Sequence, residues 1–166
     1  LADYQGTAKA SHIRDKIGEM VHLTETLFGG SIACSAEGVK TPSGAYYPNT
    51  LLANTVKLNV TRHIYEICRL AHDIAGGVIA TLPSEKDLRD PEIGKYVQKY
   101  FAGAAGVPTE HRLRICRLIE NMTGGTALVE SMHGAGSPQA QRVMILRQAN
   151  LEQKKRLAKK LAGIDK

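Results

Sequence analysis

The sequence predicts an all-α fold, organised as a single helical bundle over residues 1–166. Long segments carry apolar residues at intervals of three and four, a spacing that places them on one face of a helix. No segment of useful length alternates apolar and polar residues as a half-buried strand does, and the sequence has no internal repeat. Tryptophan is absent and only 5% of the residues are aromatic, so we expect an aliphatic core.

The first predicted helix runs from about Thr7 to Phe28, where the apolar spacing is regular. Gly29 and Gly30 then interrupt this helix, although Ser31–Glu37 could continue it beyond a kink. The following segment, residues 38–48, is rich in Gly, Pro, Ser and Tyr, and this composition predicts a loop.

A second long helix is predicted to begin near Asn49 or Thr50, because either side chain can cap the free N–H groups of a first helical turn. Its apolar stripe is long, and the helix is expected to stop around Ala75–Gly77. The short apolar stretch Val78–Leu82 could be extended, and Pro83 ends it.

Four further helices are predicted in the second half of the chain. Ser84 begins a sequence typical of a helix start, and the segment Asp90–Phe101 is a short helix with an aspartate cap and an early proline. Thr109 is expected to cap a longer helix, which Gly124-Gly125 breaks or ends. The last predicted helix covers residues 138–161.

The segment Glu130–Gln139 is the most informative part of the sequence for function. We expect a loop that carries an acid, a hydroxyl, an imidazole and two glycines just before a helix begins. Glycines let the backbone approach a ligand closely, and a helix N-terminus offers N–H groups to a phosphate or a developing enolate. Glu130 is a candidate general base, provided that it is buried. The alternative is an ordinary loop in which Gly136 and Ser137 simply start a helix.

The double glycine Gly76-Gly77 is a second and weaker candidate. A glycine pair after a long helix usually marks only the C-terminal end of that helix. The alternative is a close approach of this backbone to a nucleotide, for which a residue without a side chain is suited.

Metal ligands are not evident in the sequence, which has three cysteines: Cys34, Cys68 and Cys116. These are widely separated and odd in number, so they predict a reducing compartment and no disulfide framework. The pairs Glu19/His22 and Glu130/His133 have the Glu-x-x-His spacing of di-iron bundles. No compelling set of further carboxylates accompanies them, and we therefore assign no metal ligand.

The net charge of +6 suits an anionic ligand or nucleic acid, but much of the excess lies near the C-terminus. Between Lys154 and Lys160 there are five basic residues and no acid. Such a segment could bind RNA or an anionic membrane, although a solvated last turn of a helix is more typical. Few aromatic residues are available to stack on bases, and we expect no nucleic acid and no membrane partner.

The ends and the hydropathy of the chain point to a cytoplasmic protein. No apolar run approaches the roughly 20 residues that span a bilayer, and the first residues do not resemble a secretory signal. The sequence also lacks an initiator methionine, so we expect a processed product or one domain of a longer protein.

Several long motifs together resemble the C-terminal part of the 4-hydroxybutyryl-CoA dehydratases. They are Ala2–Gly6, Ala8–His12, Asp73–Gly77, Leu82–Asp87, Arg117–Thr123 and Glu130–Gln141. The resemblance extends over essentially the whole chain. The wider family includes flavin-dependent 4-hydroxyphenylacetate 3-monooxygenases, whose fold resembles that of acyl-CoA dehydrogenases. This resemblance implies that residues 1–166 form the C-terminal helical bundle of a larger flavoenzyme.

The resemblance also implies an activity and its cofactors. These enzymes dehydrate 4-hydroxybutyryl-CoA to crotonyl-CoA and isomerise vinylacetyl-CoA, and they use FAD and a [4Fe-4S] cluster. We expect the ligands of that cluster upstream of Leu1 and do not assign the three cysteines to it. The implied partners are an acyl-CoA substrate, the remaining domains of the same enzyme and further copies of it in a homotetramer.

The matching motifs imply roles for individual residues. Glu130 matches a glutamate near the substrate and is our candidate for proton transfer. Gly76 and Gly77 match the region where the relatives' bundle meets FAD. The backbone at His133, Gly134 and Gly136 is expected to form a substrate or flavin wall. The sequence is also shorter between Thr123 and Glu130 than the family pattern.

Two alternative functions remain open. One is a flavin-dependent aromatic monooxygenase-type domain without a cluster, which should lack the acid–imidazole segment around Glu130. The other is a non-catalytic helical module that assembles larger subunits, for which an absent flavin signal would be evidence.

Overall fold

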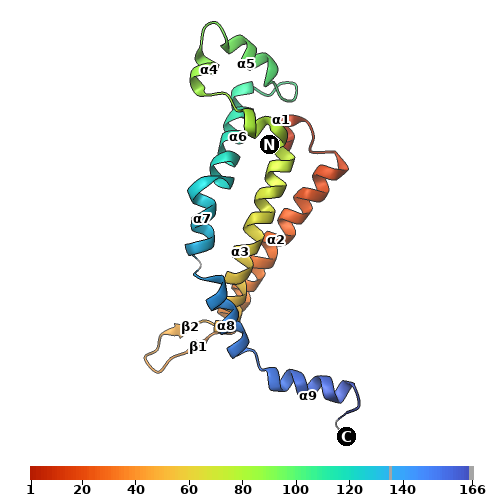
Figure 1. The fold of residues 1–166 in the computed structure, drawn as a ribbon, viewed down its shortest axis with the longest axis vertical. Helices are drawn as coiled ribbons and strands as arrows, with labels where there is room; N and C mark the ends of the chain where they lie inside the picture. The colour runs from red at the N-terminus through yellow and green to blue at the C-terminus, as the bar shows by residue number, and fades with distance from the viewer. Residues whose placement is uncertain (135, 165–166) are drawn as a thin grey trace. The chain divides into compact units, whose positions relative to one another are not determined.

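A computed structural model describes residues 1–134 and 136–164, and within these ranges the fold is all-α apart from one short hairpin (Figure 1). The helices are α1 (Ala2–Gln5), α2 (Ser11–Ala36), α3 (Thr50–Ala75), the 3-10 helix η1 (Gly76–Thr81), α4 (Glu85–Arg89), α5 (Gly94–Tyr100), α6 (Thr109–Thr123), α7 (Gly125–Gly134), α8 (Pro138–Gln148) and α9 (Leu151–Leu161). The hairpin strands are β1 (Val39–Lys40) and β2 (Tyr46–Tyr47), paired antiparallel within the predicted loop. The predicted all-α class is confirmed.

The described chain forms two compact units. The first contains residues 1–25 and 62–134, and the second contains residues 26–61 and 136–164. Both long helices, α2 and α3, contribute a part to each unit. That residues 1–166 form one domain of a larger flavoenzyme stays a prediction.

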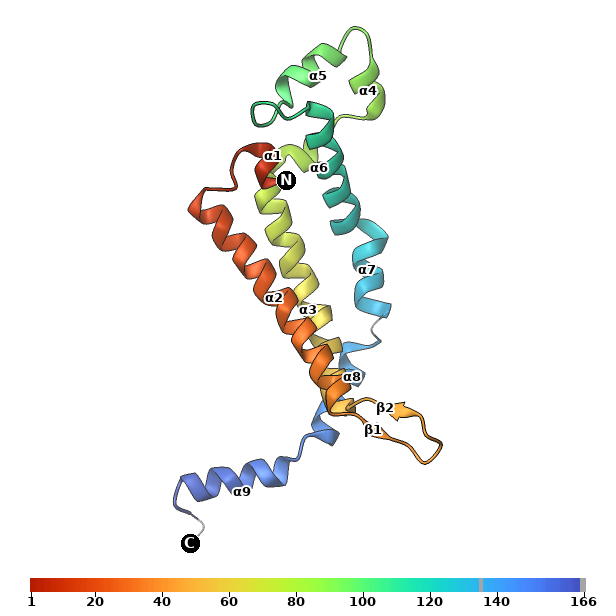
Figure 2. The same cartoon turned by 180° about the vertical axis from the view of Figure 1, so that it is seen from behind.

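In the first unit, α3 lies beside α2 and also beside the α6–α7 segment, as both views show (Figures 1 and 2). Lys16 on α2 pairs with Asp73 on α3 at 2.8 Å. Along α6, the Oγ1 of Thr123 lies 2.5 Å from Nε2 of His72. The buried apolar side chains of this unit include Ile13, Cys68, Leu70, Val97, Leu113 and Cys116.

The second unit shows that α2 continues through Gly29-Gly30, contrary to the predicted interruption. A Cβ built on Gly30 would lie 2.7 Å from Cγ2 of Val56, whereas one on Gly29 would meet nothing within 4 Å. Gly30 therefore permits a close approach of α2 to α3. Packing against α3 outweighs the low helix propensity of glycine.

Local capping explains where several predicted helices begin. The Asn49 side chain accepts a hydrogen bond from the Leu52 N–H at 3.0 Å, and α3 starts at Thr50 as expected. Ser84 and Asp87 form a capping box at the start of α4, which confirms that helix start. Asp90 accepts from two backbone N–H groups, but it caps a turn and the helix itself begins only at Gly94.

Three other boundaries differ from the prediction. The first long helix begins at Ser11, because residues 2–5 form a separate turn of helix that ends at Gly6 with a φ of 73°. The Val78–Leu82 stretch is not extended up to Thr81 but belongs to η1. Thr109 does not act as a cap: it is the first residue of α6, and its hydroxyl donates to the carbonyl of Gln98.

The predicted helix of residues 138–161 is divided into α8 and α9. Ala149 has an extended backbone, and the Asn150 side chain accepts a hydrogen bond from the Gln153 N–H at 3.0 Å. Asn150 is thus the N-cap of a new helix, a role for which asparagine is well suited. The apolar and basic spacing on both sides is compatible with one helix, which is why the sequence pattern alone did not reveal the break.

Candidate functional site

Glu130 and His133 lie on a helix, not in the predicted loop. Helix α7 begins at Gly125 and ends at Gly134, so the glycine pair at 124–125 separates two helices. Residues 126–133 contain no glycine or proline, and the Ser131 hydroxyl donates to the Ala127 carbonyl at 2.8 Å within the helix. Helix formation therefore continues to the first glycine after His133.

Within α7 the acid and the imidazole are placed for joint use. Residues three positions apart lie on neighbouring parts of one helix face, so Glu130 and His133 project in similar directions. Both residues are exposed in the described chain. The burial that a general base at Glu130 requires is thus not supplied by residues 1–134 and 136–164.

The helix start after this segment is confirmed. Gly136 has a φ of 86°, Ser137 is the N-cap of α8, and Pro138 is its first residue. The Ser137 hydroxyl accepts from the Ala140 N–H at 3.5 Å, and Gln141 Nε2 donates to the Gly136 carbonyl at 3.2 Å. Gly136 belongs to the second unit, whereas Glu130, His133 and Gly134 belong to the first, and Ala135 lies outside the described residues.

The backbone at Gly76-Gly77 is open to a ligand. Helix α3 ends at Ala75, and Gly76 has a left-handed φ of 67° that favours glycine. Both glycines are exposed, and a Cβ on either would meet nothing within 4 Å. The described residues thus leave space for a group to contact this backbone directly.

Contacts along α3 show how the two candidate regions of the first unit are separated. Tyr65 Oη lies 3.4 Å from Sδ of Met132, which places the last turns of α7 beside Tyr65. Gly76 follows Tyr65 by 11 positions, or roughly 16 Å along a helix axis. The structure therefore does not bring Gly76 next to Glu130, and only an elongated ligand could contact both.

The described residues provide no evident metal site. Among residues 1–134 and 136–164, no three His, Cys, Asp or Glu side chains gather closely enough to hold a metal ion. All three cysteines are buried and free. Burial raises the pKa of the Cys68 and Cys116 thiols, which favours the neutral thiol over the thiolate that binds metals.

An apolar groove in the first unit was not expected from the sequence. It has a volume of about 590 Å³ and is lined mainly by α2, α3 and α6, with Ile17, Met20, Val21, Ile64, Ile67 and Met122 among its residues. Most of these residues belong to the apolar stripes that predict a closed core. Met122 nevertheless remains 61% exposed. Nothing in the sequence distinguishes a stripe that closes a core from one that lines a groove.

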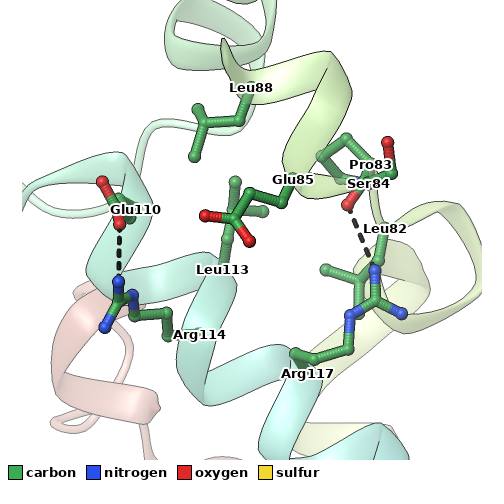
Figure 3. A pocket seen from close by; sticks show the side chains of 9 residues that line it. All are labelled: Leu82, Pro83, Ser84, Glu85, Leu88, Glu110, Leu113, Arg114 and Arg117. Atoms are coloured by element: carbon green, nitrogen blue, oxygen red, sulfur yellow. Dashed lines mark hydrogen bonds and ion pairs between the residues drawn. The ribbon is translucent and has the colours of Figure 1, made fainter.

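A second pocket, of about 340 Å³, lies between α4 and α6 (Figure 3). Leu88 and Leu113 supply apolar surface, and the rim carries charged groups of both signs. Arg114 pairs with Glu110 at 2.9 Å, and Arg117 donates to the Pro83 carbonyl at 3.1 Å. These cations already have protein partners, so the pocket is not a ready anion site.

The comparison with known proteins decides the family. Residues 1–163 match the sequence profile of HpaB, 4-hydroxyphenylacetate 3-hydroxylase C terminal. The chain belongs to this family. None of the helices in its described part is both long and apolar enough to cross a membrane.

Within the HpaB family, the chain is most informatively compared with two dehydratases. It is 54% identical to the 4-hydroxybutyryl-CoA dehydratase/vinylacetyl-CoA-Delta-isomerase of Clostridium aminobutyricum, an alignment that covers 98% of this chain and 36% of the relative. The solved structure of an oxygen-tolerant archaeal 4-hydroxybutyryl-CoA dehydratase from N. maritimus is 58% identical, with a TM-score of 0.93 over 99% of this chain and 34% of that one. The chain thus spans about a third of the length of these relatives.

More distant members share the fold. The 4-hydroxyphenylacetate 3-monooxygenase oxygenase component of Escherichia coli is 26% identical over 87% of this chain and 29% of its own length. The solved structure of an HpaB oxygenase component complexed with FAD is 22% identical, with a TM-score of 0.85 over 96% of this chain and 34% of that one. The predicted resemblance to both branches of the family is confirmed.

The alignment with the Clostridium relative also shows a difference in length. It covers 175 positions, although this chain has only 166 residues, so at least nine positions of the relative have no counterpart here. That the missing positions lie between Thr123 and Glu130 stays a prediction.

Proposed function

We propose that this chain is the C-terminal helical part of a dehydratase that converts 4-hydroxybutyryl-CoA to crotonyl-CoA and isomerises vinylacetyl-CoA. The supporting observation is the contrast in identity: 54% and 58% to the two dehydratases, against 26% to the monooxygenase component. All of these relatives share the fold, so the fold alone does not separate the two activities. The higher identity over the whole chain favours the dehydratase.

In this proposal Glu130 moves a proton at the acyl chain. A hydrogen on the carbon beside a thioester carbonyl is far more acidic than a hydrogen on the following carbon. A carboxylate close to the more acidic hydrogen can therefore begin the reaction by removing it. His133, on the same face of α7, lies close enough along the helix to hydrogen-bond the same substrate. The Gly134 and Gly136 backbone would line the wall beside it. The remaining domains of the enzyme would bury Glu130.

The Gly76-Gly77 backbone fits a flavin contact. It is exposed and has no side chains, and outside the adjoining stretch of chain no atom of the described residues lies within 4 Å of a Cβ built on either glycine. When bound, FAD would supply the electron acceptor that dehydration at an unactivated carbon requires. The role of this chain would be to position the cofactor against the substrate.

The [4Fe-4S] cluster does not fit the residues of this chain. The cysteines of this chain are buried, and in its described part no three candidate ligands lie close enough together to hold a metal ion. We therefore propose that other domains hold the cluster. The same proposal includes a homotetrameric assembly in the cytoplasm, with neither nucleic acid nor membrane as a partner.

The test of the proton-transfer role is Glu130→Gln in the full-length enzyme that contains this chain. The variant should retain FAD and iron but lose at least 100-fold in dehydration rate, because an amide cannot accept the proton. Glu19→Gln is the matched control, since Glu19 begins the other exposed Glu-x-x-His pair on a helix. Near-normal turnover of Glu130→Gln would refute the assignment.

Assays of the same full-length enzyme distinguish the proposed dehydratase from the two alternative functions. A monooxygenase would hydroxylate 4-hydroxyphenylacetate when supplied with reduced flavin and oxygen, and we expect no such product. A non-catalytic assembly module would show neither flavin absorption nor dehydration in the full-length protein.

A further inference from the structure

The side chain of Gln5 joins the N-terminal segment to the end of α3. Its Nε2 donates a hydrogen bond of 3.1 Å to the carbonyl oxygen of Ala75, a residue 70 positions away. Ala75 is the last residue of α3, is only 1% exposed, and directly precedes Gly76-Gly77. The last carbonyls of an α-helix lack their usual helical partners, so an outside donor can fix where the helix ends.

The segment that carries Gln5 is itself firmly held. The Tyr4 carbonyl accepts a hydrogen bond of 2.7 Å from the N–H of Ala104. A Cβ on Gly103 would lie 2.2 Å from the same carbonyl oxygen, so only glycine allows this approach. Gln5 thus extends from an anchored backbone, and its hydrogen bond can transmit the position of that backbone to Ala75.

We infer that Gln5 is a positioning residue for the Gly76-Gly77 backbone, acting through the Ala75 carbonyl. This inference rests on the proposed function, in which that backbone contacts FAD. The two glycines are exposed, and the space next to their α-carbons is open, so packing there does little to fix them. The buried residue before them is where their position is set. The proposed mechanism gives no role to the motif Ala2–Gly6. In this inference the motif positions the Gly76-Gly77 backbone.

The test measures FAD binding in the full-length enzyme that contains this chain. Gln5→Met keeps the length of the side chain but removes the donor. We expect the Kd for FAD, measured by flavin fluorescence, to rise about five- to tenfold. Thr7→Val is the matched control: it removes a hydrogen bond from the Thr7 hydroxyl to the Ala2 carbonyl in the same segment and leaves the Gln5–Ala75 hydrogen bond in place. The control should bind FAD as the parent does, and an equal loss in both variants would overturn the inference.

A second variant keeps the test decisive if Gln5→Met does not fold. In Gln5→Glu the side chain can donate to the Ala75 carbonyl only while it is protonated. Relative to the parent at the same pH, FAD affinity should be weakened near pH 8 and should recover as the pH falls toward the pKa of glutamate, about 4.3. A ratio that does not change with pH would overturn the inference.

Gly77→Ala separates a failure of the inference from a failure of the proposed function. Among the described residues outside the adjoining stretch of chain, nothing lies within 4 Å of the added Cβ, so weaker FAD binding would report a contact with the flavin. If Gly77→Ala weakens FAD binding and Gln5→Met does not, the inference is wrong and the flavin contact stands. If neither variant changes the Kd, the flavin contact itself is wrong and the inference fails with it.

Discussion

Glu110 shows how one side chain can stabilise the packing of two helices. Its carboxylate, on α6, lies 2.8 Å from Arg89 at the end of α4 and 2.9 Å from Arg114 one turn further along α6 (Figure 3 shows the second pair). Hydrogen bonds from these two guanidinium groups hold the pKa of the Glu110 carboxyl below its usual range. Glu110 is therefore more readily ionised in the folded protein than in the unfolded chain.

The lowered pKa predicts how stability depends on pH. A group whose pKa is lower in the folded state stabilises the protein above its unfolded pKa, about 4.3 for glutamate. That contribution is lost as the pH falls through the folded value. We expect Glu110→Gln to lower the thermal midpoint at pH 7, and the difference from the parent to shrink steadily below about pH 4.3.

The control for this experiment is Glu152→Gln on α9. Glu152 pairs with Lys155 at 2.7 Å, but both side chains are mostly exposed, so the pair contributes little. The thermal midpoint of Glu152→Gln should match that of the parent at every pH from 7 to 3. A difference for Glu110→Gln that is constant from pH 7 to pH 3 would mean that the carboxylate charge is not what stabilises this contact.

At the scale of elements, the two adjacent glycines in α2 have opposite environments. Replacing Gly29 with alanine adds a methyl group that meets no described atom within 4 Å. It also removes the extra conformational freedom that glycine has in the unfolded chain. We expect the unfolding free energy to rise by roughly 0.5–1 kcal/mol. Gly30→Ala has the same favourable effect on the unfolded chain, but it places its Cβ against Val56. We therefore expect the unfolding free energy of Gly30→Ala to fall by about 1 kcal/mol.

Urea unfolding of the two variants, followed by circular dichroism, measures this contrast. Because the glycines are neighbours in one helix, differences in helix propensity cancel between them. Equal changes in both variants would show that α2 does not approach α3 as closely at Gly30 as the structure has it. The double variant Gly30→Ala/Val56→Ala should recover part of the loss caused by the first substitution.

These elements also show which boundaries a sequence can predict. Asn49 and Ser84 were identified correctly because a cap depends only on residues within one turn. The continuity of α2 through Gly29-Gly30 depends on Val56, which is distant in sequence. The helical state of Glu130 and His133 was missed because the glycines that follow them resemble a loop, although those glycines only end the helix. A contact between distant segments decided the continuity of α2, whereas the helical state of Glu130 and His133 and the cap at Asn150 depend on residues nearby in the sequence.

At the scale of the whole molecule, the motifs correctly predicted the family, whereas the roles of the site residues stay predictions. The long motifs identified the family because a match over many positions does not depend on geometry, and the comparisons confirm it. The placement of Glu130 relative to Gly76 required the structure, since it follows from contacts of α3 with α6 and α7. The residues that would bury Glu130 belong, in our proposal, to other domains. Residues 1–166 therefore could not reveal that part of the site.

The proposed division of cofactors between domains leads to a prediction for the isolated chain. If other domains hold the [4Fe-4S] cluster, anaerobic treatment of the 166-residue chain with iron and sulfide should give no stable broad visible absorption beyond that of a chain-free mixture. The physical reason is that cluster ligation needs several thiolates close together, whereas Cys68 and Cys116 are buried thiols whose pKa is raised. Chelation of iron from the full-length enzyme should then abolish dehydration, whereas the circular dichroism of the isolated chain should be the same with and without a chelator. A chain in which Cys34, Cys68 and Cys116 are all replaced by alanine is the control. A stable cluster on the parent chain that is lost in this variant would show that these cysteines do bind iron, and would refute the assignment of the cluster to other domains.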